Sequence, residues 1–296
     1  MSGAVSTSCR IGCQGWAHPP WVGKFFTATA RREDYLPQYA SVFAAVEGNA
    51  TFYALPPAET VAKWTEEAPA HLRFCFKFPR TISHDRRLVE ARAETAEFFA
   101  RVAPLGARLG TFFLQLHQSF GARGLPALEA YLRGLPKEFT YAVEVRHADF
   151  FDHGPHEQAL TDLLGGLGVD RVTFDTRGLF ASGAADENTA GAQKRKPKSP
   201  VRFTATGRRP FVRFVGDPDV AKNIPALREW ADQVARWIGD GRTPYFFAHH
   251  PDDTYAPHVA REFQRLLHER TATVPAPAGW PIERNQSPSA EQLDLF

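Results

Sequence analysis

The stretch PFVRFVGDPDVAKNIPALREWADQVARWIGDGRTPYFFA, residues 210–248, contains two short apolar segments separated by a longer amphipathic one. The apolar segments, 210–215 and 244–248, are rich in Phe and Val and bounded by Gly or Pro, which is typical of buried parallel strands. Between them, apolar residues recur at helical spacing: Leu227, Trp230, Val234, Trp237 and Ile238. Because Gly239 follows directly, we expect the helix to end there. The stretch therefore predicts a strand, a helix and a second, parallel strand.

The same alternation recurs along most of the chain. Further short apolar segments lie at 10–12, 42–46, 73–77, 111–116, 140–145 and 171–175. About eight strand–helix units are typical of a TIM-type (β/α)₈ barrel, so we expect a single α/β domain over residues 1–270 and a flexible tail over 271–296. A doubly wound open sheet is the alternative, but no Gly-x-Gly-x-x-Gly follows a strand segment to support its dinucleotide-binding form.

The composition is that of a globular protein. The chain has 296 residues, of which 43% are hydrophobic and 23% charged, and its formal net charge is +2. This charge excludes nucleic-acid binding by bulk charge, so any such contact must come from a local patch. No segment approaches the roughly 18 apolar residues of a membrane span, and residues 1–10 lack the apolar core of a signal peptide. With three cysteines and no disulfide framework, we expect a cytoplasmic protein without membrane contact.

Two segments lack the strand and helix patterns. Residues 181–200 are small, polar and rich in lysine, which favours a mobile loop after the sixth strand. The run 194–198 carries no acidic residue and could track phosphates, although a solvated loop is the commoner explanation for such a run. Residues 271–296 are rich in Pro, Ala and Ser, and predict a tail that is disordered or lies along the surface.

Ionisable residues follow the predicted strands at their carboxyl ends, where a barrel places its active face. The acids at these ends are the candidate catalytic groups, as general base, second acid or metal ligand: Glu47, Glu144 and Asp175. The candidate substrate-binding residues there are Asn49, Lys77, Gln115, Arg146 and Arg213. Because buried charge is costly unless paired, this concentration favours a site for an anionic substrate. A neutralised ring of ion pairs that only closes the barrel is the alternative.

Aromatic and histidine residues support two further hypotheses. Trp16 and Tyr53 could stack on a ring or base of the substrate, or belong to a packed lid over the barrel. His84 and His249 are candidate ligands for a divalent metal, together with the acids. No His-Glu-x-x-His or Cys-x-x-Cys spacing supports such a metal, so the cofactor stays open.

Several motifs together resemble the YecE-like family, also called DUF72. They are GCQGW (12–16), WVGKFF (21–26), VEGNATFYALP (46–56), Trp64, FKFPRTISH (76–84), LQL (114–116), AVEVRH (142–147) and VRFVG (212–216). The resemblance covers roughly residues 10–268 and implies a TIM-type barrel, but it implies no reaction. The chain departs from the family pattern at Ala50, where the family usually has a hydroxyl residue, and at 248–250, where Ala-His-His replaces Phe-Asn-Asn.

The last five residues form a second resemblance. Gln292, Leu293, Asp294, Leu295 and Phe296 are similar to the peptide by which bacterial polymerases and repair proteins dock on the DNA sliding clamp. A tail of this kind would offer apolar anchors and a hydrogen-bonding glutamine after a Pro- and Ser-rich linker. An apolar chain end that packs back on the barrel is the alternative.

These patterns lead to one preferred function and two alternatives. The preferred hypothesis is a DNA-associated hydrolase of phosphoester or glycosidic bonds, recruited by the sliding clamp and binding DNA or a nucleotide in the barrel mouth. The first alternative is a small-molecule enzyme that acts on an anionic or sugar-like substrate. The second is a non-catalytic adaptor in DNA maintenance.

Overall fold

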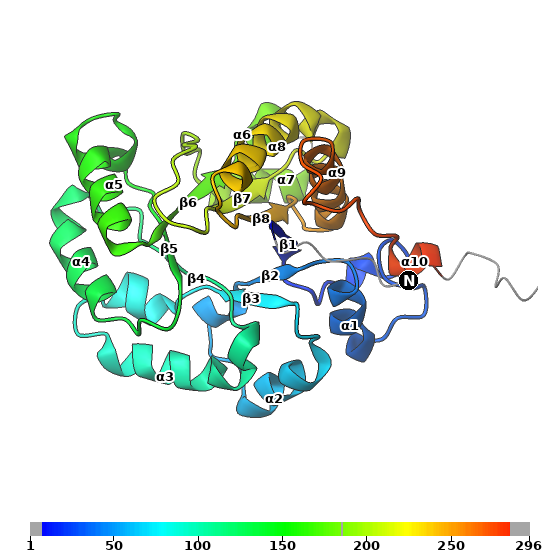
Figure 1. The fold of residues 1–296 in the computed structure, drawn as a ribbon, viewed down its shortest axis with the longest axis horizontal. Coiled ribbons are helices and arrows are strands. Elements are labelled where there is room, and N and C mark those ends of the chain that lie inside the picture. The colour runs from blue at the N-terminus through cyan, green and yellow to red at the C-terminus, as the bar shows by residue number, and fades with distance from the viewer. Residues whose placement is uncertain (1–7, 185, 285–296) are drawn as a thin grey trace, which may run out of the picture.

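Eight parallel strands form a nearly closed cylinder in the computed structural model, which describes residues 8–184 and 186–284 (Figure 1). The strands are β1 Arg10–Gln14, β2 Ala45–Gly48, β3 Arg73–Phe76, β4 Phe112–Gln115, β5 Tyr141–Glu144, β6 Asp170–Asp175, β7 Phe211–Val215 and β8 Tyr245–His249. Their spatial order is β3-β2-β1-β8-β7-β6-β5-β4. Parallel bridges between Phe74 and Leu109 and between Lys77 and Phe113 join β3 to the β4 side. The expected TIM-type α/β barrel is therefore confirmed.

Helices surround this cylinder on its outside (Figure 1). They are α1 Tyr35–Ala40, α2 Ala58–Glu67, α3 Arg92–Val102, α4 Leu125–Arg133, α5 Pro155–Leu167, α6 Arg177–Ala181, α7 Glu187–Arg195, α8 Ile224–Gly239, α9 Ala256–His268 and α10 Pro281–Arg284. Proline occupies the first turn of α8 and of α9, where its missing N–H has no partner to lose. Among the described residues, no helix is long and apolar enough to cross a bilayer.

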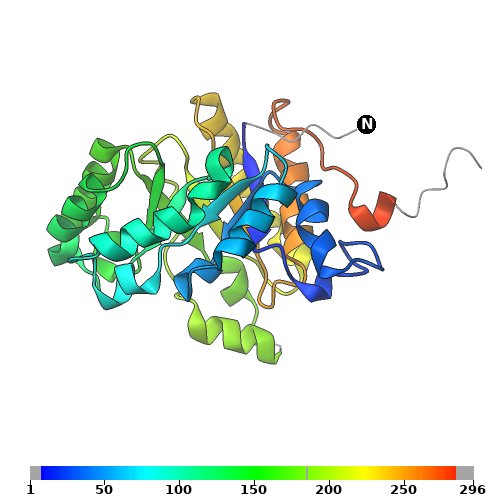
Figure 2. The same cartoon turned by 90° about the horizontal axis from the view of Figure 1, so that it is seen from below.

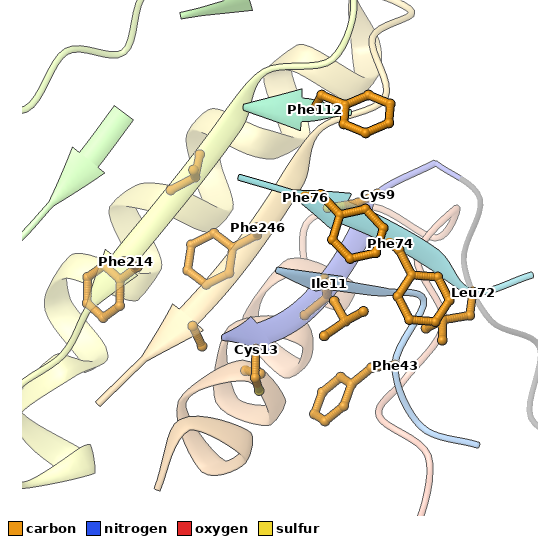
Figure 3. Packing of buried hydrophobic residues seen from close by; sticks show 14 of the residues in the cluster. Cys9, Ile11, Cys13, Phe43, Leu72, Phe74, Phe76, Phe112, Phe214 and Phe246 are labelled. Carbon is orange, nitrogen blue, oxygen red and sulfur yellow. The ribbon is translucent and has the colours of Figure 1, made fainter. Parts of the chain in front are cut away.

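Alternation along each strand divides the core into two layers. Side chains that point outward pack under the helices, as Figure 3 shows for Phe74, Phe214 and Phe246 among others. The Phe246 ring lies parallel to that of Phe263 on α9, with the centroids 3.6 Å apart. Side chains of the opposite parity form a separate buried cluster inside the barrel: Ala45, Cys75, Phe113, Ala142, Val172, Phe211, Tyr245 and Phe247. We call this cluster the interior plug.

The segment 181–200 differs from the mobile loop expected there. It contains α7, which projects from one end of the barrel (Figure 2), and Asp186 caps this helix by accepting a hydrogen bond from the Thr189 backbone N–H. Ala192 is buried against the residues that precede α7, in a cluster with Leu179. The small residues that suggested a loop are compatible with a short capped helix because the cap and this contact stabilise it.

Residues 271–284 lie along the surface, which is one of the two forms expected for the tail. Val274 and Trp280 are buried, and the Trp280 ring packs edge-on against Phe25 at 5.5 Å and His258 at 4.6 Å. The clamp-like peptide 292–296 lies outside the described residues. The start of the tail is thus attached to the barrel by aromatic contacts.

A tyrosine hydroxyl links the first two strands at a point where the sequence has a glycine. Tyr39 on α1 donates to the Ala45 carbonyl oxygen at 2.7 Å and accepts from the Cys13 N–H at 2.8 Å. A Cβ atom on Gly12 would lie 1.9 Å from that carbonyl oxygen and 2.8 Å from the hydroxyl. The absence of a side chain at this position therefore allows α1 to attach to the barrel wall.

We expect Gly12→Ala to lower the free energy of unfolding by about 3 kcal/mol, because the added methyl group overlaps backbone atoms that cannot move freely. Urea denaturation measures this change. Gly166→Ala in α5 is the control, since a Cβ there meets no atom within 4 Å and should stabilise the helix by about 0.5–1 kcal/mol. Equal stability of Gly12→Ala and the wild type would contradict the proposed role of Gly12.

Candidate functional site

Polar side chains from six strands meet at the carboxyl end of the barrel, which we call the mouth. The set comprises Glu47, Asn49, Lys77, Gln115, Glu144, Arg146, Arg213 and His249, and we call it the mouth cluster. These residues have the same strand parity as the interior plug, so they form the next layer above it. The structure thus brings together all five expected substrate-binding residues from the strand ends, two of the three expected acids and one expected metal ligand.

Arg213 on β7 lies at the centre of the mouth cluster. Its Nε and Nη2 donate to the two carboxylate oxygens of Glu47 at 2.9 and 2.7 Å, and its Nη1 donates to Glu144. The rings of Phe113 and Phe174 lie 5.0 and 4.9 Å from its guanidinium carbon. The planar fork of arginine suits this two-carboxylate arrangement, which lysine could not reproduce.

A chain of hydrogen bonds continues from Glu144 along the rim. Arg146 donates to Glu144 at 2.9 Å and to the side-chain oxygen of Gln115 at 2.8 Å. The same oxygen accepts from the Lys77 amine at 2.7 Å. Lys77 and Arg146 therefore share one neutral acceptor, and Lys77 has no ion pair with a described carboxylate.

The two glutamates are held in their charged form. Burial would raise the pKa of Glu47, but the charge of Arg213 and the hydrogen bonds from Arg213 and His249 hold that pKa well below its usual range. Burial acts in the same direction on Glu144, and Arg213, Arg146 and Lys77 outweigh it, so the pKa of Glu144 falls to about 2. Both carboxylates are therefore ionised at neutral pH.

Lys77 is the mouth residue that titrates near neutrality. Burial lowers the pKa of its amine, and the charge of Arg213 lowers it further, to about 7. The ammonium form is partly stabilised by the face of the Phe52 ring, whose centroid lies 3.8 Å from Nζ. Because a pKa near the working pH suits proton transfer, Lys77 has a property that the two glutamates lack.

Two buried acceptors of the mouth cluster have unused hydrogen-bonding capacity. His249 is fully buried and faces Glu47 through Nε2 at 3.0 Å, while its Nδ1 has no partner among the described residues. Burial lowers the pKa of His249, so the ring is neutral and Nε2 donates to the carboxylate. The side-chain oxygen of Asn49 is also buried without a described partner. Such orphaned groups indicate a place for a ligand or water.

Lys196 directly follows α7 and is half-buried. Burial lowers the pKa of its amine, and the charges of Asp253, Arg213 and Glu47 also act on that pKa. Among the described residues, no hydrogen bond or ion pair joins the Lys196 amine to the mouth cluster. The strand-end pattern does not select this residue, although the lysine-rich run 194–198 contains it.

Asp175, Trp16 and Tyr53 are not brought into the mouth cluster. Asp175 has the outward parity on β6 and accepts from Arg177 and, at 2.8 Å, from the Trp230 indole of α8. Trp16 packs edge-on against Trp64 at 5.0 Å, outside the barrel wall. Tyr53 is 82% exposed.

The expected metal ligands are not gathered into a metal centre. His84 bonds to Ser83 and packs edge-on against Phe52, and burial followed by the charge of His117 lowers its pKa to about 4. Both oxygens of Glu47 are already occupied by Arg213. In the described part of the chain, no group of three His, Cys, Asp or Glu residues could hold a metal ion.

Comparisons with known proteins place the chain among relatives of the same fold. The family model described as "Protein of unknown function DUF72" matches residues 10–283. The "UPF0759 protein YecE" of Escherichia coli K12 is 42% identical over 269 residues, covering 90% of this chain and 96% of that protein, and the O157:H7 protein is 41% identical with the same coverage.

Solved structures are similar in fold at lower identity. A DUF72 family protein from Thermotoga maritima MSB8 gives a TM-score of 0.66 at 20% identity and covers 88% of this chain and 99% of its own. One from Enterococcus faecalis V583 gives 0.65 at 17% identity and covers 88% and 95%. At these identities the likeness concerns the fold.

We expect acid to destabilise the wild type more than Glu144→Gln between pH 4.5 and 2. The depressed pKa of Glu144 contributes stability that is complete above pH 4.5 and is lost as the pH falls to about 2, a difference of about 3 kcal/mol. Urea denaturation across this pH range measures the two slopes.

Glu129→Gln is the control for this experiment. It removes an exposed carboxylate whose pair with Arg133 lies on the surface of α4, where such pairs contribute less than about 1 kcal/mol. If Glu144→Gln and the wild type lose stability in parallel, Arg213 and Arg146 do not hold Glu144 in its charged form.

Proposed function

The chain belongs to the DUF72 family, and from the mouth cluster we propose that it is an enzyme that binds a phosphate-bearing substrate at the barrel mouth and donates a proton from Lys77 to the leaving group. The observation that carries this proposal is the buried Lys77 amine, which donates to the neutral Gln115 side chain and has no ion pair with a described carboxylate. Its pKa of about 7 agrees with this environment. The reaction class is hydrolysis of a phosphoester or glycosidic bond.

The charge of the mouth favours an anionic substrate. Four cationic side chains lie in or beside the mouth cluster: Lys77, Arg146, Lys196 and Arg213. They face the carboxylates of Glu47 and Glu144 and that of Asp253, which acts on Lys196, so an excess of one positive charge remains when Lys77 is protonated. A bound phosphate would neutralise this excess, and arginine and lysine donors match its oxygens.

The glutamates act in this proposal by positioning Arg213. Their low pKa values and occupied oxygens make them poor proton acceptors at neutral pH, in contrast to the general-base role expected from the sequence. By fixing the guanidinium they set the electrostatic field at Lys77. We therefore assign proton transfer to Lys77, and substrate orientation to Arg146, Lys196, and the buried acceptors of Asn49 and His249.

Substrate binding and proton transfer are coupled through Lys77. A bound dianion adds negative charge beside the amine and raises its pKa, so the amine takes up a proton when the substrate binds. The ammonium then donates this proton to the departing oxygen as the bond breaks. Attack by water supplies a proton that restores the ammonium, so the cycle needs no further reactant.

Sulfate is a suitable probe because it is a dianion that does not titrate near neutral pH. We expect isothermal titration at pH 7, in buffers of different ionisation enthalpy, to show that sulfate binding takes up about half a proton in the wild type. Lys77→Met should remove this uptake. Lys63→Met, which removes an exposed amine of α2, is the control and should behave as the wild type.

Two results would overturn the proposal. The first is sulfate binding without proton uptake in the wild type, and the second is the same uptake in Lys77→Met. To identify the substrate, the protein is then incubated with phosphosugars and with nicked or abasic DNA, and the release of inorganic phosphate or of sugar is measured. An adaptor would bind without turnover of any of these.

Recruitment to DNA is a separate part of the proposal and depends on the sequence of residues 292–296. The family model ends at residue 283, so the clamp-like peptide is additional to the region shared with DUF72 proteins. Trp280 is buried against the barrel and anchors the tail there. The clamp-like peptide begins at residue 292, which is 12 residues after this anchor.

We expect the full chain to bind the bacterial sliding clamp with micromolar affinity and a variant ending at Glu291 to lose this binding. Titration of clamp monitored by light scattering or interferometry measures it. The double variant Leu295→Ala/Phe296→Ala keeps the chain length and should also fail to bind. Equal binding by all three chains would remove the argument for DNA association.

A further inference from the structure

A second polar cavity lies at the opposite end of the barrel, where the strands begin. Its volume is about 350 Å³, and three arginines and a tyrosine line it: Arg10, Arg73, Arg209 and Tyr245. Arg10, Arg73 and Tyr245 are the first residues of β1, β3 and β8, and Arg209 precedes β7 by two residues. Arg73, Arg209 and Tyr245 have the interior parity, because Cys75, Phe211 and Phe247 of the plug lie two positions further along the chain. Arg10 is in register with Tyr245 on the neighbouring strand and so shares its face.

The interior plug separates this cavity from the mouth. Phe113, Phe211 and Phe247 are buried within it, with the Phe211 ring 5.3 Å from Phe113 and 5.0 Å from Phe247. A ligand in the cavity therefore cannot touch the mouth cluster. The cavity is a separate candidate site.

The three arginines have no ion pair with any described residue. Arg10 donates to the His71 carbonyl oxygen, Arg73 donates to the Ala70 and Leu72 carbonyl oxygens, and the side chain of Arg209 makes no hydrogen bond within the described residues. One exposed carboxylate, Glu138, is also in the lining. The lining thus carries three positive charges and one negative charge. A further carboxylate, that of the buried Asp170, is not in the lining and accepts from the Arg209 backbone N–H.

The arginines act on one another and on the tyrosine. Burial is the main cause that lowers the pKa of Arg73, and the charge of Arg10 lowers it further. Burial raises the pKa of Tyr245, while the charges of Arg10, Arg209 and Arg73, which line the same cavity, oppose this. The hydroxyl stays neutral and is available as a donor. Repulsion of this kind is relieved by a bound anion.

We infer that this cavity binds a compact phosphate group, either inorganic phosphate or the phosphate of a small molecule, through Arg10, Arg73, Arg209 and the Tyr245 hydroxyl. Three arginines line this one cavity and have no ion-pair partner among the described residues, which suits the several oxygens of a phosphate, and the volume leaves room for a small attached group. The site is independent of the catalytic proposal, because no residue is shared with the mouth cluster.

The test uses the full chain with the double substitution Lys77→Met/Lys196→Met, which removes two positive charges from the proposed site at the mouth. We call this variant the mouth-disabled background. We expect inorganic phosphate to bind this protein in calorimetry, and Arg209→Gln in the same background to weaken binding at least about tenfold. Arg209 is the first choice because its side chain has no described hydrogen bond whose loss would affect folding. Tyr245→Phe keeps the ring of the plug and should weaken binding by a smaller factor.

Arg228→Gln is the matched control, since it removes the same charge from an exposed position of α8 and should leave phosphate affinity unchanged. A tungstate soak of crystals should show density among the three arginines.

Unchanged affinity in Arg209→Gln, or equal losses in Arg209→Gln and Arg228→Gln, would overturn the inference. If phosphate binds the wild type but not the mouth-disabled background, the mouth alone binds phosphate. Glucose 6-phosphate in place of phosphate separates a free ion from a phosphorylated small molecule.

Discussion

The contact of Arg213 with two buried glutamates is the interaction on which the mouth depends. It connects β7 to β2 and β5 across the barrel, and the carboxylates it joins are 166 and 69 residues away in the chain. Desolvation of three charges makes a net gain in stability small, whereas loss of one partner leaves an uncompensated charge inside the barrel. The contact therefore serves mainly to fix geometry. Burial is the main cause of the low pKa of Lys77, and the charge of Arg213 lowers this pKa further, while the two glutamates oppose the shift.

Charge is distributed in layers along the barrel axis. The mouth carries an excess of positive charge, the interior plug is aromatic and apolar, and the opposite end carries three further arginines. Because an apolar layer separates the two polar ends, an anion bound at one end would have no contact with the other. The barrel itself specifies neither site, because fold and function are separable and the site residues decide the chemistry.

Membership of the DUF72 family establishes the fold of this chain but does not identify the chemistry of the mouth. The relatives match this chain over nearly the whole barrel, and in this chain His249 ends β8 in the mouth. Here the imidazole donates to Glu47 and keeps a buried acceptor on its other face.

The sequence determined the barrel, the strand ends that carry polar residues and the identity of most of the mouth cluster. Two periodicities suffice for this, because a period of two assigns the faces of a strand and a period near 3.6 assigns the face of a helix. Parity could also have excluded Asp175, which alternates with the inward-facing Phe174. Only the tertiary structure decided which charges touch, that Lys77 rather than a glutamate titrates near neutrality, and that three arginines from distant strands line one cavity. These properties depend on burial and on distances between residues far apart in the chain, and neither quantity is contained in local sequence pattern.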